Sequence, residues 1–183
     1  GLPFAGGMAG IKFVFSAINE PAVLCDLMDR EGVTDSAGVP TVWLATFQHC
    51  DANDRPLPKL RAATIGGSAA PKFMIRRLME AGIRVQHAWG MTETSPLGTL
   101  GALPPHLVNA DIDTRMEQKL KQGRPPFGVE LKIVDDEGKV LPNDGETSGR
   151  LMVSGAAIAA GYFKGVGGDV LDEDGYFDTG DVA

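Results

Sequence analysis

Residues 87–96 combine side chains that suit the binding of a nucleotide. Within this stretch the aromatic ring of Trp89 precedes two hydroxyls, those of Thr92 and Thr94, and the carboxylate of Glu93. An aromatic ring can stack on a base, a hydroxyl can donate a hydrogen bond to a phosphate oxygen, and a carboxylate is a hard oxygen ligand of the kind Mg²⁺ prefers. Because this mixture is poorly suited to a hydrophobic core, we interpret the segment as a nucleotide-binding loop.

A short apolar segment comes directly before this loop and would position it. Residues 82–86, Gly-Ile-Arg-Val-Gln, predict a buried strand. Open α/β sheets bind their ligands outside the carboxyl ends of the strands. We therefore expect the polar residues of 87–96 to emerge from the end of a strand.

The loop also carries a resemblance to a known family. Residues 89–94, Trp-Gly-Met-Thr-Glu-Thr, resemble the aromatic-Gly-x-Thr-Glu motif of the adenylate-forming (AMP-binding) enzymes, which include acyl-CoA synthetases, peptide-synthetase adenylation domains and beetle luciferases. Further segments resemble other motifs of this family in the family's order: 66–71, 149–153 with 161–163, and 176–181. Four motifs in the correct order across nearly the whole chain argue against coincidence. The chain is identified as a member of this superfamily.

The resemblance implies an activity and a set of site residues. The activity is ATP-dependent formation of an acyl-adenylate from a carboxylic acid, followed by transfer of the acyl group to coenzyme A. Thr92 and Glu93 would be catalytic, with Glu93 holding Mg²⁺, and the carboxylate of Asp181 would accept hydrogen bonds from both ribose hydroxyls. The nucleotide-binding residues implied are Gly66, Gly67, Ser68, Ala69, His87, Ala88, Trp89, Gly90, Met91, Thr92 and Asp181.

Several of these residues also have a simpler structural interpretation. Trp89 could fill a core and Glu93 could be a solvated acid, but the neighbouring motifs favour the ligand roles. Ser68 could cap the helix that begins at Pro71 and contact a ligand as well. His87 is either a hydrogen-bonded residue at the strand end or a contact near the adenine and acyl groups, and the sequence leaves both open.

Two segments favour a fatty acid as the substrate. Residues 37–45 and 66–71 resemble bacterial medium- and long-chain fatty acyl-CoA synthetases, in which the first segment and the end of the second border the acyl tunnel. Val39, Pro40 and Trp43 would then form an apolar wall suited to an alkyl chain. Two alternatives remain: an adenylation domain that loads a carrier protein, and a noncatalytic nucleotide-binding relative.

Some family features are altered or absent. Trp89 stands where many members carry tyrosine, and Ala88 where many carry glycine. The phosphate loop with its lysine and the carboxyl-terminal domain with the catalytic lysine do not occur in this sequence. We therefore expect an internal piece of a larger ligase that is inactive by itself.

Composition indicates an ordinary globular segment. The 183 residues are 43% hydrophobic, and the net charge of -7 argues against a nucleic-acid partner. Cys25 and Cys50 lack the spacing of a metal site or a disulfide framework, which favours reduced thiols and a cytoplasmic location. No apolar run is long enough for a transmembrane segment. Peripheral membrane association of the full-length protein and its oligomeric state stay open.

The hydrophobic pattern predicts an α/β fold in two parts. In residues 1–123, which carry the adenine loop and the Thr-Glu motif, strands alternate with amphipathic helices, which indicates a parallel sheet flanked by helices. The expected strands are 11–15, 33–37 and 62–65, and the expected helices are 21–30, 41–50 beginning after Pro40, one opened by Pro71, and a short surface helix within 104–122. The resemblance assigns this part to the large N-terminal domain of an adenylate-forming enzyme.

The pattern changes after residue 123. Residues 129–134 alternate strictly, 135–138 indicate a turn, and 150–154 would pair with the first strand. Residues 124–183 are thus expected to form a small antiparallel β subdomain that ends at the Thr-Gly-Asp motif.

Overall fold

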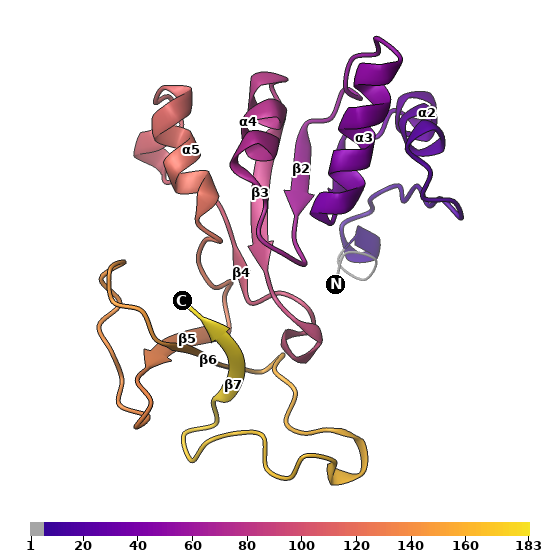
Figure 1. Cartoon of the computed structure of the whole chain (residues 1–183). Coiled ribbons are helices and arrows are strands. Elements are labelled where there is room, and N and C mark those ends of the chain that lie inside the picture. The colour runs from indigo at the N-terminus through magenta and orange to yellow at the C-terminus, as the bar shows by residue number, and fades with distance from the viewer. Residues whose placement is uncertain (1–5) are drawn as a thin grey trace. The chain divides into compact units, whose positions relative to one another are not determined.

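The computed structural model describes residues 6–183 and divides into two compact units (Figure 1). Unit 1 comprises the described part of Gly1–Trp89 together with Thr99–Arg124. Unit 2 comprises Gly90–Gly98 and Pro125–Ala183. The short segment that follows the third strand thus belongs to the second unit, and each unit is described by itself below.

Unit 1 is built on a four-stranded sheet in the order β1-β2-β3-β4. Strands β1 (Asp35–Gly38), β2 (Ala62–Ile65) and β3 (Arg84–Trp89) are parallel, as the alternating pattern predicted. Strand β4 (Thr99–Leu100) pairs antiparallel with the end of β3 and was not predicted. Parallel strands need crossover connections, and helices provide them here.

The helices of unit 1 begin and end at residues with clear local signals. They are α2 (Pro21–Glu31), α3 (Pro40–Ala52), α4 (Lys72–Glu80) and α5 (Ile112–Leu120). A proline occupies the first turn of α2 and of α3, where its missing N–H costs no helical hydrogen bond. Gly32 ends α2 in the left-handed conformation, with φ at 62°. The Asp111 carboxylate caps α5 by accepting a 2.9 Å hydrogen bond from the N–H of Thr114.

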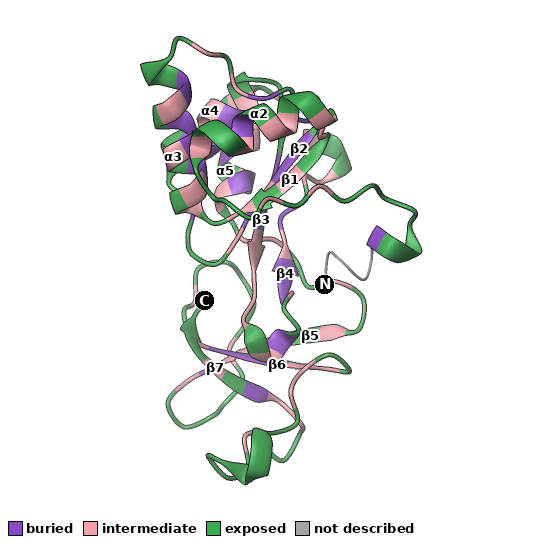
Figure 2. Cartoon of the chain, turned by 90° about the vertical axis from the view of Figure 1, so that its right-hand side faces the viewer, coloured by how far each residue is buried: buried purple, intermediate pink, exposed green. Residues whose placement is uncertain are grey.

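The core of unit 1 lies between the sheet and its helices (Figure 2). Helix α4 places Met74 and Ile75 and, one helical turn further on, Leu78 on one buried face. These side chains pack in one cluster with apolar residues of α3, β2 and β3: Trp43, Phe47, Ala63, Ile65 and Val85. Burial of each large side chain contributes about 1.5–3 kcal/mol, so this cluster fixes α4 and α3 against the strands that carry the candidate site.

Two expectations for unit 1 were wrong. Residues 11–15 form no strand, and Ile11 and Phe15 are exposed, because no strand within residues 6–183 pairs with them. The strand expected to end at residue 86 continues to Trp89. Its last residues find hydrogen-bonding partners in β4, where Ala88 pairs with Leu100 and Trp89 with Thr99.

Unit 2 contains a three-stranded antiparallel sheet in the order β5-β6-β7. Strands β5 (Val129–Val134) and β6 (Arg150–Gly155) pair as the alternation of 129–134 predicted. Strand β7 (Phe177–Val182) was not predicted as a strand, because its Thr-Gly-Asp sequence is typical of a turn. Buried Phe177 pairs with buried Val153 of β6 and holds the strand in place.

Short 3-10 segments complete the structure: η1 (Thr92–Thr94), η2 (Pro105–Leu107) and η3 (Phe163–Gly165). Cys25 and Cys50 are both buried and free. Within residues 6–183, no helix combines the length and apolar character needed to cross a bilayer.

Candidate nucleotide-binding site

The residues predicted to bind the nucleotide are divided between the two units. Residues 66–69 and 87–89 belong to unit 1, whereas residues 90–93 and Asp181 belong to unit 2. The structure therefore gives the geometry of each half of the candidate site separately.

In unit 1 the loop 66–71 leaves the carboxyl end of β2 and leads into α4. It packs closely on β3, because a Cβ atom at Gly66 would lie 3.2 Å from the carbonyl oxygen of Ala88. Gly67 adopts a φ of 86°, which favours glycine. Gly67, Ser68 and Ala69 are exposed, as a loop that receives a flat base requires. Ser68 does not cap α4, whose N-cap is Pro71 without a side-chain hydrogen bond, so ligand contact remains the prediction for its hydroxyl.

His87 lies inside β3 and is only 2% exposed. Its Nε2 accepts a 3.2 Å hydrogen bond from the N–H of Ala70, at the end of the candidate adenine loop. Burial lowers the pKa of the imidazole below its ordinary value of 6.5, because the charged form is disfavoured away from water. Of the two interpretations left open, the structure favours a buried, hydrogen-bonded histidine that anchors the loop.

A buried lysine of α5 is linked to strand β3 through the backbone of Gly101. Lys119 of α5 is buried, and its Nζ donates a 3.0 Å hydrogen bond to the carbonyl oxygen of Gly101. The N–H of Gly101 in turn donates a 2.6 Å hydrogen bond to the carbonyl oxygen of His87. Burial lowers the pKa of Lys119 to about 8. Nothing in the sequence pattern singles out this lysine, which resembles an ordinary helix-surface residue.

Trp89 ends β3 and is half-buried beside the exposed loop. The predicted acyl-pocket residues differ among themselves. Val39 is 44% exposed, and its Cγ1 would lie 3.0 Å from a Cβ atom at Gly67. Pro40 begins α3, whereas Trp43 is 3% exposed and belongs to the core cluster, with its indole Nε1 buried and unbonded among the described residues. Val39 is thus the member of this set that adjoins the adenine loop, and its pocket role stays a prediction.

In unit 2 the Thr-Glu motif forms the compact turn η1. The Thr94 hydroxyl is buried; it donates to the carbonyl oxygen of Met91 and accepts from the N–H of Met91, both at 3.0 Å. This corrects the expectation that Thr94 donates to a phosphate oxygen, because its hydroxyl is already engaged within the turn. Thr92 is exposed at the surface of the same turn.

Gly90 allows the turn to close. A Cβ atom at this position would overlap the carbonyl group of Pro96 and lie 3.0 Å from the N–H nitrogen of Gly98. Only glycine fits between the backbone segments on either side of η1.

The carboxylate of Glu93 has a side-chain partner that the sequence did not predict. The hydroxyl of Tyr162 donates a 2.7 Å hydrogen bond to Oε1 of Glu93. The backbone carbonyl oxygen of Glu93 accepts a second bond, of 2.8 Å, from the N–H of Ala159. The hydrogen bond from Tyr162 lowers the pKa of Glu93, because it stabilises the ionised carboxylate. Gly161-Tyr162 belongs to one of the family-like motifs of the sequence, but nothing in the sequence connects it with Glu93.

Asp181 lies on β7 with its side chain exposed. Its N–H donates a 3.1 Å hydrogen bond to the Thr179 hydroxyl, which itself donates a 2.8 Å bond to the carbonyl oxygen of Leu151 on β6. The Thr-Gly-Asp motif is therefore held as a strand by its own threonine rather than left as a free turn.

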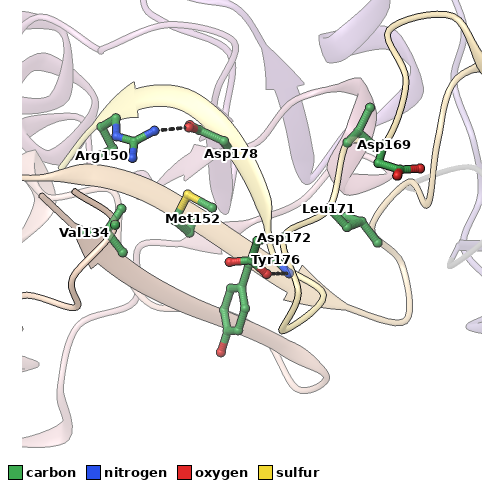
Figure 3. Close-up of a pocket in the computed structure, with 10 residues that line it drawn as sticks. Val134, Arg150, Met152, Asp169, Leu171, Asp172, Tyr176 and Asp178 are labelled. Carbon is green, nitrogen blue, oxygen red and sulfur yellow. Dashed lines mark hydrogen bonds and ion pairs between the residues drawn. The ribbon is translucent and has the colours of Figure 1, made fainter. Parts of the chain in front are cut away.

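A shallow pocket of about 340 Å³ lies next to this motif (Figure 3). Arg150 and Asp178 line it and form an ion pair of 2.5 Å across β6 and β7. None of the predicted nucleotide-binding residues lines this pocket. The pocket therefore shares no residue with the candidate site.

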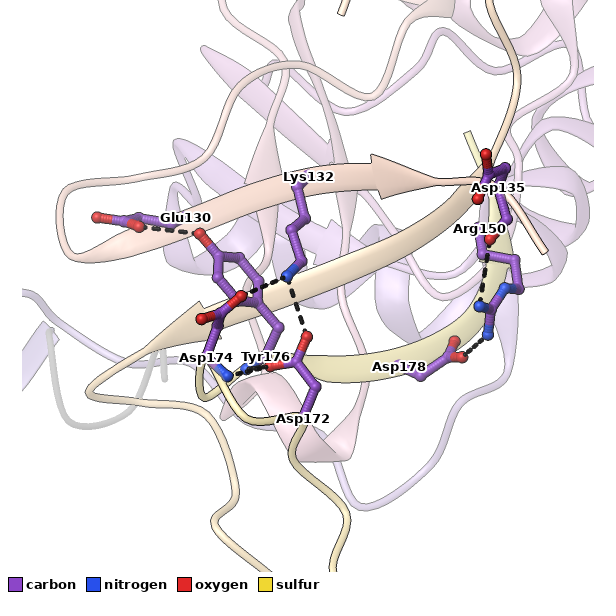
Figure 4. A network of polar contacts seen from close by, with 8 residues as sticks. All are labelled: Glu130, Lys132, Asp135, Arg150, Asp172, Asp174, Tyr176 and Asp178. Atoms are coloured by element: carbon purple, nitrogen blue, oxygen red, sulfur yellow. Dashed lines mark hydrogen bonds and ion pairs between the residues drawn. The ribbon is translucent and has the colours of Figure 1, made fainter. Parts of the chain in front are cut away.

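A network of charges holds the turn before β7 (Figure 4). Nζ of Lys132 lies 3.0 Å from Asp172 and 3.8 Å from Asp174, and 3.9 Å from the centroid of the Tyr176 ring. The Tyr176 hydroxyl donates a 3.1 Å bond to Glu130. These contacts join β5 to the turn that leads into β7, the strand that carries Asp181. They thereby fix where β7 begins.

The described residues contain no group of three or more histidine, cysteine, aspartate or glutamate side chains that could hold a metal ion. This composition still suits Mg²⁺ at Glu93, because Mg²⁺ in phosphate-transfer sites is commonly held by one or two carboxylates together with the substrate's phosphates. A buried all-protein metal cage is not required for that arrangement.

Comparison with known proteins decides the family. Residues 3–163 match the family described as AMP-binding enzyme. The chain belongs to the AMP-binding enzyme family. Over the whole of this chain it is 42% identical to a medium-chain-fatty-acid–CoA ligase of Ectopseudomonas oleovorans and 42% identical to a 3-methylmercaptopropionyl-CoA ligase of Ruegeria pomeroyi. The chain spans 34% of the length of each of these two relatives.

A solved structure of this family has the same fold. The o-succinylbenzoate coenzyme A synthetase of Bacillus subtilis, in complex with ATP and magnesium ion, matches 98% of this chain with a TM-score of 0.77 and 25% identity. The match covers 35% of that chain. The fold predicted from the sequence, a parallel sheet flanked by helices followed by a small antiparallel sheet, is thereby confirmed as that of an AMP-binding enzyme.

Proposed function

We propose that this chain is part of an ATP-dependent acyl-CoA synthetase that acts on a fatty acid. The observation that carries the proposal is the 42% identity, over the entire chain, to ligases that join carboxylic acids to coenzyme A. The exposed hydroxyl of Thr92 and the carboxylate of Glu93 in the Thr-Glu turn suit this chemistry. Because the chain spans about a third of each relative, the activity is assigned to the longer protein.

The proposed reaction has two steps. In the first, an oxygen of the substrate carboxylate attacks the α-phosphorus of ATP and pyrophosphate leaves, which gives the acyl-adenylate. In the second, the sulfur of coenzyme A attacks the acyl carbon, AMP leaves, and the thiol loses its proton. The substrate carboxylate is itself the nucleophile in the first step, so no nucleophilic serine or cysteine of the protein is required.

Glu93 and Thr92 would act on the phosphates. A bound Mg²⁺ would supply positive charge that offsets the charge gathering on the phosphate oxygens. Glu93 would hold this ion through its ionised carboxylate, and the exposed Thr92 hydroxyl would donate a hydrogen bond to a phosphate oxygen. Thr94 is left out of this role because its hydroxyl is bonded to Met91.

The remaining residues would orient the nucleotide. The exposed loop 66–69, with Ala88 and Trp89 behind it, would receive the adenine, and Asp181 would accept hydrogen bonds from the ribose hydroxyls. His87 would support this arrangement through Ala70 rather than touch the ligand. Gly90 and Met91 would contribute backbone groups of the turn. Fixed orientation of this kind lowers the entropic part of the activation barrier.

An apolar acid is the substrate that the chain favours. Val39 presents an exposed apolar surface beside Gly67, which suits an alkyl chain. The relatives named above act on acids that differ, as their names state, so chain length is left to experiment. We place the reaction in the cytoplasm, where ATP and coenzyme A are at hand, with peripheral membrane association as an alternative to be tested.

The direct test is product formation by the full-length ligase that contains this chain. The enzyme is supplied with ATP, MgCl₂, coenzyme A and a panel of alkanoic, aromatic and amino acids, and thioesters are quantified by mass spectrometry. We expect acyl-CoA with alkanoic acids. An adenylate that reacts only with a phosphopantetheine-bearing carrier protein would favour the carrier-loading alternative, and the absence of any product would favour a noncatalytic relative.

A further inference from the structure

The segment 156–168 of unit 2 is attached to the Thr-Glu turn through Glu93. This segment is largely exposed: Phe163 is 84% and Tyr162 45% accessible. It turns repeatedly through left-handed backbone conformations at Lys164, Gly165, Gly167 and Gly168. Such a segment has little packing of its own to hold it in one place.

Two hydrogen bonds join this segment to η1, and both end on Glu93. The N–H of Ala159 donates to the Glu93 carbonyl oxygen at 2.8 Å, and the hydroxyl of Tyr162 donates to Oε1 at 2.7 Å. Within residues 6–183, Tyr162 is the residue of segment 156–168 whose side chain makes a hydrogen bond, and its partner is Glu93. The phenol is thus committed to a single partner.

The hydrogen bond uses only one of the two carboxylate oxygens. Oε1 accepts from the Tyr162 hydroxyl, the one side-chain donor that bonds this carboxylate within residues 6–183, and the backbone N–H of Glu93 itself also stabilises the ionised form. A carboxylate on a flexible side chain would otherwise rotate freely, since Glu93 is only half-buried. Donors that bond to a metal-binding carboxylate fix its orientation and thereby raise its affinity for the ion.

We propose that Tyr162 is a positioning residue for Glu93, which holds the carboxylate with Oε2 available to a divalent cation on bound ATP. This inference rests on the proposed function, in which Glu93 holds Mg²⁺. It adds a residue 69 positions away in the sequence, on a different segment, to the groups that set the magnesium dependence of nucleotide binding.

The test measures binding rather than turnover, in the full-length ligase. Dissociation constants for ATP are determined by calorimetry across a series of MgCl₂ concentrations, and the constant for AMP is determined without Mg²⁺. Tyr162→Phe removes only the hydroxyl and leaves the Ala159 bond, so the segment stays attached. The matched control is Phe163→Leu, at the exposed neighbouring position.

We expect Tyr162→Phe to raise the MgCl₂ concentration that gives half-maximal tightening of ATP binding by about three- to tenfold, while AMP affinity stays within about twofold. This is smaller than the roughly tenfold to hundredfold effect typical of such partners, because Tyr162 is partly exposed. Phe163→Leu should change neither quantity.

Three results would overturn the inference. An unchanged magnesium dependence in Tyr162→Phe would show that the hydroxyl does not position Glu93. Equal weakening of AMP and ATP binding would show a general structural role instead. If Glu93→Gln also left the magnesium dependence unchanged, the proposed role of Glu93 would fail together with that of Tyr162, whereas a large effect of Glu93→Gln alone would reject Tyr162 only.

Discussion

The N–H of Ala70 donates a 3.2 Å hydrogen bond to Nε2 of His87, which lies in the interior strand β3 of the sheet of unit 1. The bond joins the end of an exposed loop, proposed to receive adenine, to a residue that is out of contact with water. Because Nε2 must accept this bond, the imidazole must carry no proton on that nitrogen. The loop is therefore anchored by a neutral histidine.

His87 should make the stability of the fold sensitive to mild acid. Its pKa in the folded chain is below 6.5, the ordinary value expected when unfolded. Above that pH the imidazole is neutral in both the folded and the unfolded chain, so His87 does not change the free energy of unfolding with pH. As the pH falls below about 6.5, the unfolded chain binds a proton that the folded chain does not, so the free energy of unfolding decreases.

His87→Gln keeps an acceptor for Ala70 but cannot be protonated. We expect the loss of stability between pH 6.5 and pH 5, measured by urea denaturation, to be smaller in this variant than in the wild type. His87→Ala, which leaves the Ala70 N–H without a partner, should cost about 1–3 kcal/mol at pH 7. Identical pH profiles for the wild type and His87→Gln would contradict this account.

Lys119 should have an effect in the alkaline range. Burial lowers its pKa to about 8, from an ordinary value of 10.5. Between these two values the unfolded chain still holds a proton that the folded chain has released, so raising the pH favours the folded state. The free energy of unfolding of the wild type should therefore rise relative to that of Lys119→Met as the pH is raised from 8 to 10.5.

Lys121→Met is the control for that experiment, since Lys121 is exposed one residue after the same helix. Its difference from the wild type should stay constant with pH. A constant difference for Lys119→Met as well would show that Lys119 is hydrated and not buried against Gly101.

Gly90 should be intolerant of any side chain. A Cβ atom would overlap the Pro96 carbonyl group, so Gly90→Ala must move one side of the Thr-Glu turn. We expect this variant to lower ATP affinity in the full-length ligase by about tenfold or more, because the groups proposed to contact phosphate shift with the turn. Gly161→Ala, which has no atom within 4 Å of the added Cβ, should bind ATP like the wild type. Equal affinities for the two variants would mean that the turn rearranges without consequence.

The sequence was sufficient for the elements whose patterns are local. Strands 62–65 and 129–134 have the predicted bounds, and α2 and α3 begin at the prolines that were expected to open or precede them. These elements follow from alternation, helical periodicity and proline geometry, all of which act over a few residues.

What the sequence could not predict depends on partners far along the chain. Strand β7 is ordered by pairing with β6, and the last residues of β3 by pairing with β4. The same holds for the side chains: the role of Tyr162 follows from Glu93, and that of Lys119 from Gly101. The predicted strand at 11–15 is wrong for the converse reason, since its apolar residues pair with no strand in the described part of the chain.

The central claim, that Glu93 belongs to the centre that adenylates an acid, is tested most directly by ATP–pyrophosphate exchange. The full-length ligase is assayed with each acid of the panel, beside Glu93→Gln and, as control, the exposed Glu117→Gln. We predict exchange that requires an alkanoic acid, falls by at least about a hundredfold in Glu93→Gln and is unchanged in Glu117→Gln. Exchange with no acid at all, or exchange that survives in Glu93→Gln, would contradict the account.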